Sequence, residues 1–159
     1  MAAAAVTGLT AGLLAACGSA VTPPPAHSAA QRNWAEYAGR FVAGLQTEIL
    51  SSQSGGADLA SARRAIANTD DVYAMLVDYT DFGACNRELG NIGVPAAGSE
   101  KIVALIISAC GRLERASSLF QDAMTNNRPA KLLAATRLAA QAAPLLADAE
   151  DGLAKLSSR

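Results

Sequence analysis

The sequence predicts an all-α protein, arranged as an antiparallel four-helix bundle. Alanine is abundant and aromatic residues make up only 4% of the 159 residues, which favours closely packed helices because alanine is the strongest helix former. Near the end of the chain Leu132, Ala139, Leu146 and Leu153 recur every seven residues. Alanine and leucine at this spacing let helices approach closely, as in antiparallel bundles. Residues 28–159 are long enough to bury one core, so a single helical domain is expected there.

The first helix is predicted over residues 28–53. Ser28 and Gln31 have the spacing of a capping box at a helix start. Large apolar residues then recur every three or four positions: Trp34, Tyr37, Phe41, Leu45 and Ile49. Such a stripe is typical of a helix that packs on a core, and the lining of a ligand pocket is the alternative.

The second helical region is predicted over residues 58–82. Asn68 and Thr69 lie near its middle, where they either cap a fresh helix or lie inside a continuous one. Both readings stay open. After this point one apolar face is expected to carry Val72, Met75, Leu76, Tyr79 and Phe82.

Four aspartates of this region are placed on the opposite face: Asp70, Asp71, Asp78 and Asp81. Clustered carboxylates raise the possibility of a Ca²⁺ site. Their spacing does not match an EF-hand loop, and no glycine stands where that loop needs one. We therefore expect a solvated acidic face and no metal site.

Residues 83–98 are predicted to be an irregular break between helices, centred on Gly90-Asn91-Ile92-Gly93-Val94-Pro95. Ile92 and Val94 are expected to pack into the end of the bundle. A binding loop is the alternative, since functional residues concentrate on loops.

The third and fourth helices are predicted over residues 99–125 and 129–157. Ser99 is expected to cap the third helix, and Pro129 suits the first turn of the fourth, where no backbone N–H is needed. Pro144 is expected to kink the fourth helix locally, because proline removes one backbone hydrogen bond.

A short apolar signal precedes the predicted domain. Residues 2–16 are mostly small and apolar, and Cys17 follows in the sequence Leu14-Ala15-Ala16-Cys17. This segment resembles the signal and lipobox of a bacterial lipoprotein precursor, in which a peptidase cuts before the cysteine and lipid is attached to its sulfur. The resemblance implies a signal peptide over residues 1–16 and lipidation of Cys17. A helix of about 15 residues rises only ~23 Å, less than the ~30 Å hydrocarbon core, so no permanent transmembrane helix is expected here.

The lipobox resemblance also implies a location. Lipoprotein maturation supplies at least two acyl chains, which suffice for stable anchoring. The mature protein would therefore sit on the extracytoplasmic face of the cell membrane. Residues 1–10 lack the basic stretch with which signal peptides begin, so we expect the true start upstream and an incomplete signal peptide. The domain itself resembles no family that we recognise, and its alanine richness is associated with GC-rich genomes such as those of actinobacteria.

Residues 17–27 are predicted to be a stiff tether between lipid and domain. Pro23, Pro24 and Pro25 are consecutive, which favours extended polyproline II. His27 is the chain's single histidine. We expect it to be solvated, with a metal-ligand or pH-sensing role as the alternative.

Three cysteines are present. With Cys17 implied as the lipid site, Cys85 and Cys110 remain. Two thiols in an exported domain most simply form one disulfide, whereas a metal site needs more ligands than two cysteines. We expect a Cys85–Cys110 disulfide in the helical bundle.

No catalytic, metal or cofactor site is predicted. A catalytic triad or a Cys–His dyad needs a histidine near its nucleophile, and His27 lies outside the domain. Every acidic residue can be placed on a solvated face or a helix end, which leaves no converging pair for glycoside hydrolysis. Neither a phosphate-binding glycine motif nor the Glu-x-x-His of a di-iron bundle occurs. The net charge of −1 provides no basic surface for nucleic acid.

These observations predict a membrane-anchored envelope lipoprotein that acts as a non-enzymatic interaction module. Its expected partners are the membrane, through lipid on Cys17, and another envelope protein. The alternative is a carrier of an apolar small molecule or lipid within the bundle, where the aromatic first helix and the Pro144 kink would open a cavity.

Overall fold

In the computed structural model, described over residues 28–53 and 56–158, the chain is all-helical. Six helices follow one another in these ranges: α1 (Ala29–Ser52), α2 (Leu59–Ala67), α3 (Thr69–Asn91), α4 (Glu100–Asn126), α5 (Pro129–Ala140) and α6 (Ala143–Ser157). The predicted signal, lipobox and tether, including Cys17 and His27, lie outside the described residues.

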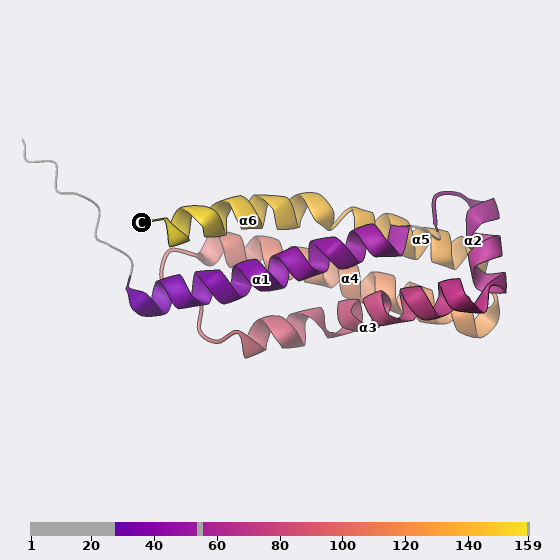
Figure 1. Ribbon diagram of the computed structural model, residues 1–159, viewed down its shortest axis with the longest axis horizontal. Helices are drawn as coiled ribbons and strands as arrows, with labels where there is room; N and C mark the ends of the chain where they lie inside the picture. The colour runs from indigo at the N-terminus through magenta and orange to yellow at the C-terminus, as the bar shows by residue number, and fades with distance from the viewer. Residues whose placement is uncertain (1–27, 54–55, 159) are drawn as a thin grey trace, which may run out of the picture.

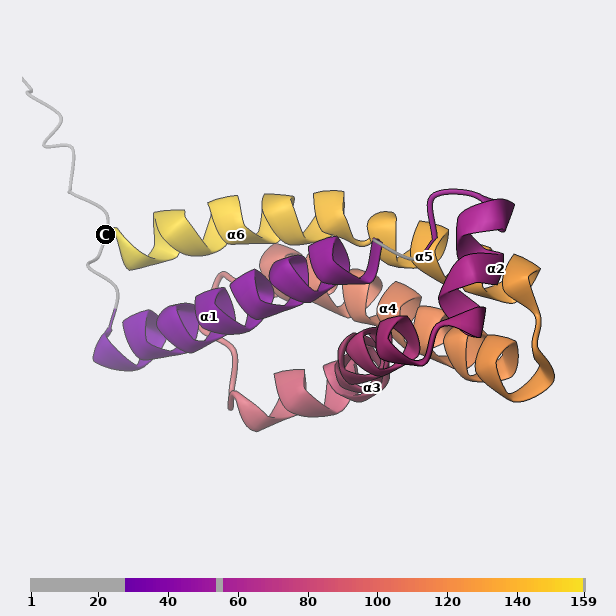
Figure 2. The same ribbon diagram turned by 45° about the vertical axis from the view of Figure 1, so that its right-hand side comes forward.

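The helices form an elongated bundle. Figure 1 shows α1, α3, α4 and the consecutive pair α5 and α6 running along its length. The short helix α2 lies across one end, as the turned view in Figure 2 makes clear. α4 packs on α3, α5 and α6, while α1 packs on α6 and α3.

α1 begins where the sequence predicts. The Ser28 hydroxyl accepts a hydrogen bond from the Gln31 amide, and the Gln31 side chain accepts one from the Ser28 amide, so the capping box is formed. Trp34, Leu45 and Ile49 are buried as expected. The prediction that Tyr37 packs on the core is wrong, because this residue is 56% exposed. The buried stripe passes instead through smaller residues, notably Ala38 and Val42.

The predicted second region is two helices. Asn68 adopts an extended backbone that ends α2, and its side chain accepts a hydrogen bond from the Asp70 amide at the start of α3. Of the two readings left open at Asn68 and Thr69, the structure shows the first: Asn68 caps a new helix and the region is not one continuous helix. Asp58 caps α2 in the same way, accepting from the Ser61 amide at 2.6 Å.

The prediction of a break over residues 83–98 is wrong for most of its length. α3 continues to Asn91, and only residues 92–99 separate it from α4. Gly83 permits close packing here, because a Cβ at this position would lie 2.9 Å from the Ser117 hydroxyl on α4. Ile92 packs against the core as expected, whereas Val94 is 90% exposed.

The predicted fourth helix is also divided. α5 ends at Ala140 and α6 begins at Ala143, with Pro144 in its first turn. The expected kink is therefore a complete interruption. The Arg112 side chain on α4 donates a hydrogen bond to the Gln141 carbonyl at this interruption. A carbonyl that the helix leaves free is thereby satisfied.

Between α3 and α4 the core holds aromatic rings and the disulfide. The Tyr79 ring stacks on Phe120 with centroids 4.4 Å apart and meets Phe82 edge-on at 5.2 Å. Cys85 and Cys110, both fully buried, form the expected disulfide with their Cα atoms 5.2 Å apart. Because Cys85 lies within α3, the disulfide joins two helices rather than a loop and a helix.

Candidate functional site

A groove open to solvent runs between α1 and α3, with a volume of about 340 Å³. Phe41 and Leu45 of α1 and Ala84 of α3 form its apolar lining. Charged side chains stand toward its ends. The two helices thus enclose a strip that offers both apolar contact and charge.

The end of the groove nearer α2 is acidic. Glu48 and Asp81 line it, and Asp78 lies close enough to repel both of them. Burial, followed by the repulsion of Asp81 and Asp78, raises the pKa of Glu48 to about 7. Burial is also the main cause that raises the pKa of Asp78, while a hydrogen bond with the Ser51 side chain opposes it.

Two carboxylate oxygens at this acidic end are buried and lack a hydrogen-bond partner. They are Glu48 Oε2 and Asp78 Oδ2. Asp78 is only 8% exposed. A buried acceptor that neither water nor a donor satisfies is energetically costly. Within residues 28–53 and 56–158, neither of these two acids nor Asp81 forms an ion pair.

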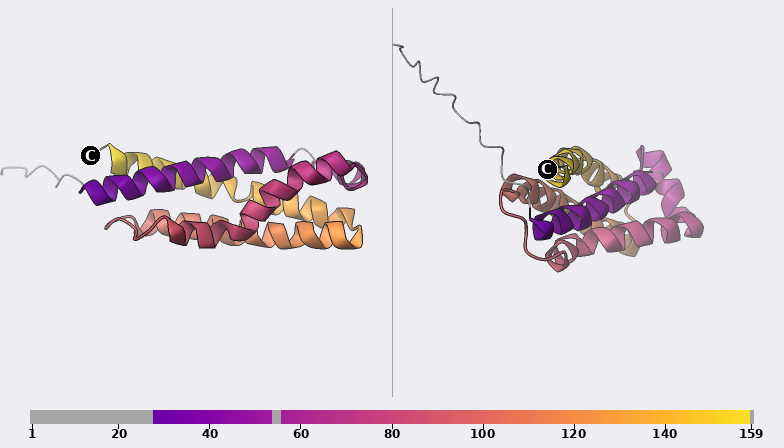
Figure 3. Two further views of the ribbon diagram at one scale, coloured as in Figure 1. Left: turned by 60° about the horizontal axis from the view of Figure 1, so that its bottom comes forward. Right: turned by 60° about the vertical axis from the view of Figure 1, so that its left-hand side comes forward.

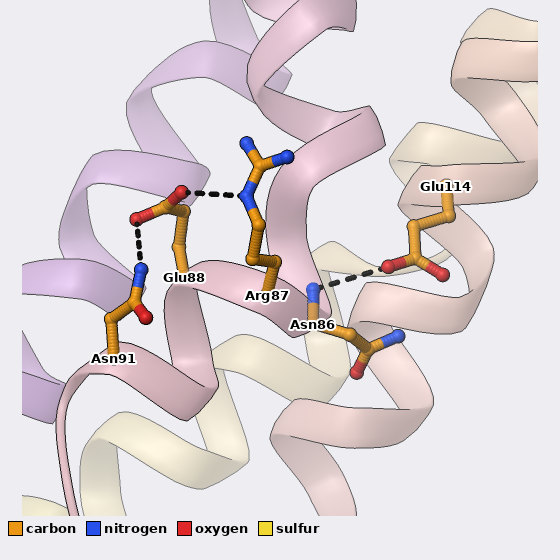
Figure 4. A network of polar contacts seen from close by, with 5 residues as sticks. All are labelled: Asn86, Arg87, Glu88, Asn91 and Glu114. Atoms are coloured by element: carbon orange, nitrogen blue, oxygen red, sulfur yellow. Dashed lines mark hydrogen bonds and ion pairs between the residues drawn. The ribbon is translucent and has the colours of Figure 1, made fainter.

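The opposite end of the groove carries both signs of charge, already paired. Arg40 pairs with Glu36 one turn earlier on α1. Arg87 lies 3.2 Å from Glu88, which also accepts a hydrogen bond from Asn91 at 3.1 Å, as Figure 4 shows. These hydrogen bonds, with Asn91 first, lower the pKa of Glu88.

The prediction of a solvated acidic face holds for three aspartates and is wrong for the fourth. Asp70, Asp71 and Asp81 are exposed, but Asp78 is buried. On a helix, position 78 lies beside positions 75, 79 and 82, the positions that α3 turns to the core. Leu76 was expected on the apolar face that packs on the core, but it is 44% exposed.

Glu48 was missed as a site residue. The prediction that every acidic residue lies on a solvated face or a helix end is wrong for Glu48, since its carboxylate is half-buried. The available signal was its place between Leu45 and Ile49, both on the buried stripe of α1. A carboxylate next to such a stripe is a candidate for a shifted pKa.

Another groove, of about 570 Å³, lies between α1 and α6. Its charged lining residues, Arg32, Glu36 and Glu150, are exposed. The α1–α3 groove is the better candidate site because, of these two, it alone is lined by a residue with a buried acceptor that lacks a partner, Glu48 Oε2.

No group of three or more His, Cys, Asp or Glu side chains is close enough to hold a metal ion in the part of the chain that the structure describes. Along the described helices, no stretch is both long and apolar enough to cross a membrane. Comparisons with protein families, with curated proteins and with solved structures find no match for this chain.

Proposed function

We propose that the chain is a membrane-anchored envelope lipoprotein whose helical domain acts as a non-enzymatic interaction module. The observation that carries this proposal is the sequence Leu14-Ala15-Ala16-Cys17, placed before a proline-rich tether and a helical domain. Lipid on Cys17 would hold the domain at the extracytoplasmic face of the cell membrane. The Cys85–Cys110 disulfide supports export, because disulfides persist in oxidising compartments.

The module itself is proposed to be an antiparallel four-helix bundle. α1, α3 and α4 supply three of its helices, and α5 with α6 together take the fourth position. The packing of α4 on α3, α5 and α6, and of α1 on α6 and α3, supports this arrangement. α2 is then an insertion that crosses one end.

An interaction at the surface is better supported than an apolar ligand inside the bundle. The middle of the domain is occupied by stacked rings and by the disulfide. Large apolar side chains lie instead at the surface: Tyr37, Leu50, Leu59, Tyr73, Leu76, Val77, Val94 and Ile107. Aromatic side chains on a surface are typical of protein contacts. The partner is accordingly proposed to be another envelope protein.

The test begins with the full-length gene, including any upstream start, expressed as wild type and as Cys17→Ser. Intact mass and membrane partitioning are measured for both. We expect the wild type to carry a multi-acyl mass increment and to stay with the membrane, and the variant to lose both. Cys85→Ala/Cys110→Ala is the matched control, which should keep the lipid. A wild type without lipid and without membrane retention would contradict the proposal.

The interaction itself is tested by crosslinking in intact cells. The expected result is a defined crosslinked species that contains the wild-type protein and one envelope protein, and that is reduced when Cys17→Ser releases the domain from the membrane. Absence of any such species in cells that retain the lipidated wild type would overturn the interaction role.

A further inference from the structure

We propose that the helical domain rests on the membrane through the connection between α3 and α4, with Val94 inserted at the boundary between lipid headgroups and acyl chains. The membrane is the one in which lipid on Cys17 would be anchored. The inference therefore rests on the proposed function, and it adds which face of the domain meets the bilayer.

The first argument is an exposed apolar surface at this connection. Val94 is 90% exposed, more than any other large apolar side chain in the part of the chain that the structure describes. Two hollows of about 330 and 270 Å³ lie beside it and share Pro95, Val103 and Ile107 as lining residues. Because these residues are common to both, the hollows are continuous. Val94, Pro95, Val103 and Ile107 are called the Val94 surface below.

The second argument is that α1 begins beside the Val94 surface. The Gln31 side chain, in the first turn of α1, donates a hydrogen bond to the Ala97 carbonyl at 3.3 Å. Trp34, one turn farther along α1, lines one of the two hollows. Figure 1 shows the start of α1 and the α3–α4 connection at the same end of the bundle. The chain therefore enters the domain at the end that carries the Val94 surface.

The third argument is the short distance from this end to the lipid. Ser28, the cap of α1, follows Cys17 by only eleven positions. A chain spans at most about 3.6 Å per residue, so Ser28 stays within about 40 Å of the lipidated residue. A surface tethered so closely meets the bilayer at a high effective concentration, and a weak apolar contact then suffices for binding.

The fourth argument favours lipid over a protein as the occupant. Residues 89–99 contain no charged side chain, and charged groups are what the membrane interior disfavours most. Backbone polar groups also resist transfer unless they are hydrogen-bonded. The Gly98 amide donates to the Glu100 carboxylate at 3.2 Å, and the Ser99 amide donates to the Ala96 carbonyl at 3.1 Å. Several polar groups of the connection are thus satisfied without water.

This orientation directs the other end of the bundle away from the membrane. Three exposed apolar residues lie there, in the half of α3 nearer to α2: Tyr73, Leu76 and Val77. The two ends would then have separate roles, with lipid at the Val94 surface and the protein partner at the end that α2 crosses.

The experiment uses the lipidated protein, produced from the full-length gene and reconstituted into vesicles of phosphatidylethanolamine and phosphatidylglycerol. Trp34 is the chain's single tryptophan and lies beside the Val94 surface, so its fluorescence reports contact without a label. Bromine on the acyl chains quenches tryptophan only at short range. We expect vesicles with brominated lipid to quench Trp34 relative to vesicles without bromine.

Variants assign the quenching to the Val94 surface. Val94→Asp should lose most of it, because a carboxylate opposes insertion, and Val94→Ser should lose part of it. Val77→Asp is the matched control, since it makes the same substitution at a position that is 63% exposed near the opposite end. It should be quenched like the wild type. All three variants keep Cys17, and Val94→Ser decides the test if Val94→Asp does not fold.

An unquenched Trp34 in vesicle-bound wild type would overturn the membrane contact. Equal quenching of the wild type and both Val94 variants would do the same, as would an equal loss in Val77→Asp. If Val94→Asp remains fully quenched but loses its crosslink to an envelope protein, the Val94 surface binds a protein and the lipid contact fails.

The two proposals can fail separately. If the wild type carries lipid and stays with the membrane but Trp34 is not quenched, the lipoprotein stands and the Val94 surface fails. If the wild type carries no lipid, the anchored function fails, and sedimentation of the unlipidated chain with the same vesicles decides the surface. It stands if Val94→Asp binds about ten-fold more weakly than Val77→Asp, the factor expected for burial of one valine side chain. It fails if the two variants bind equally or if the wild type does not bind.

Discussion

The carboxylate of Glu114 on α4 accepts a hydrogen bond from the backbone amide of Asn86, which lies within α3 (3.1 Å; Figure 4). An amide inside a helix ordinarily donates to the carbonyl four residues earlier, here that of Phe82. A side chain that enters this ladder is one cause of helix bending. Figure 3 shows α3 changing direction along its length, and Gly83 and Cys85 contact α4 in the same region.

Replacing Glu114 with alanine is expected to expose the Asn86 amide. We predict faster hydrogen exchange at Asn86 and a loss of about 1 kcal/mol in the free energy of unfolding, the typical net value of one hydrogen bond. Hydrogen exchange followed by NMR measures the first quantity, and urea unfolding the second. Glu114→Gln keeps an acceptor oxygen and should retain most of the protection. Unchanged exchange at Asn86 in Glu114→Ala would show that the carboxylate does not protect it.

Glu48 should make stability depend on pH. Its pKa rises from 4.5 to about 7 on folding, so between these values the folded state binds more protons than the unfolded state. Stability is then greatest at the acidic side of this window and falls as pH rises through it. Because water partly screens this half-buried group, we expect a loss of only about 1–2 kcal/mol.

Urea unfolding between pH 4 and pH 8 measures the effect of Glu48. Glu48→Gln should flatten much of the decline and be more stable than the wild type at pH 8. Some slope should remain, because the pKa of Asp78 is raised as well. Glu150→Gln, at an exposed position on α6, should leave the profile unchanged. A wild type whose stability rises steadily from pH 5 to pH 7 would rule out the buried carboxylate as its main titrating group.

The disulfide should account for much of the stability of the α3–α4 pair. Cys85 and Cys110 are separated by 25 residues, and closing a loop of that size restricts the unfolded chain. We predict that Cys85→Ala/Cys110→Ala lowers the free energy of unfolding by about 3 kcal/mol. Urea unfolding with and without a reducing agent tests this. Reductant should destabilise the wild type and leave the double variant unaffected, and a wild type indifferent to reductant would refute the prediction.

Gly152 lets α6 approach α4. A Cβ at this position would lie 2.7 Å from Cγ1 and 2.9 Å from Cδ1 of Ile102. Although alanine is a better helix former than glycine, we expect Gly152→Ala to destabilise by about 1–3 kcal/mol through overpacking. A double-mutant cycle with Ile102→Ala measures the coupling. The alanine at 152 should be tolerated better when Ile102 is shortened, and purely additive effects would argue against the close approach.

The starts of α1 and α5 could be predicted from sequence because they depend on nearby residues. The Ser28–Gln31 capping box and the position of Pro129 in the first turn of α5 are both local patterns. Cys85 and Cys110 could be paired by counting, because the lipobox resemblance implies a separate role for Cys17. Each of these inferences needs only residue types and short spacings.

The remaining differences arise from tertiary contacts. Gly83 and Gly90 are ordinarily helix-weakening, yet α3 continues through both, since packing and the disulfide to α4 stabilise it. Asp78 was assigned to the wrong face because a carboxylate is rarely buried. The acidic end of the groove depends on α1 meeting α3, and neither helix alone predicts that Glu48 faces Asp78 and Asp81.

The start of α1 and the end of α6 lie at the same end of the domain (Figure 1). A short linker from Ser157 to Ser28 could therefore join them, and the chain could be reopened in the exposed connection at Val94. Such a circular permutant would begin with α4 and end with α3. Its Cys85–Cys110 disulfide would then join the last helix to the first. The covalent loop that this disulfide closes would contain nearly the whole chain instead of a short segment.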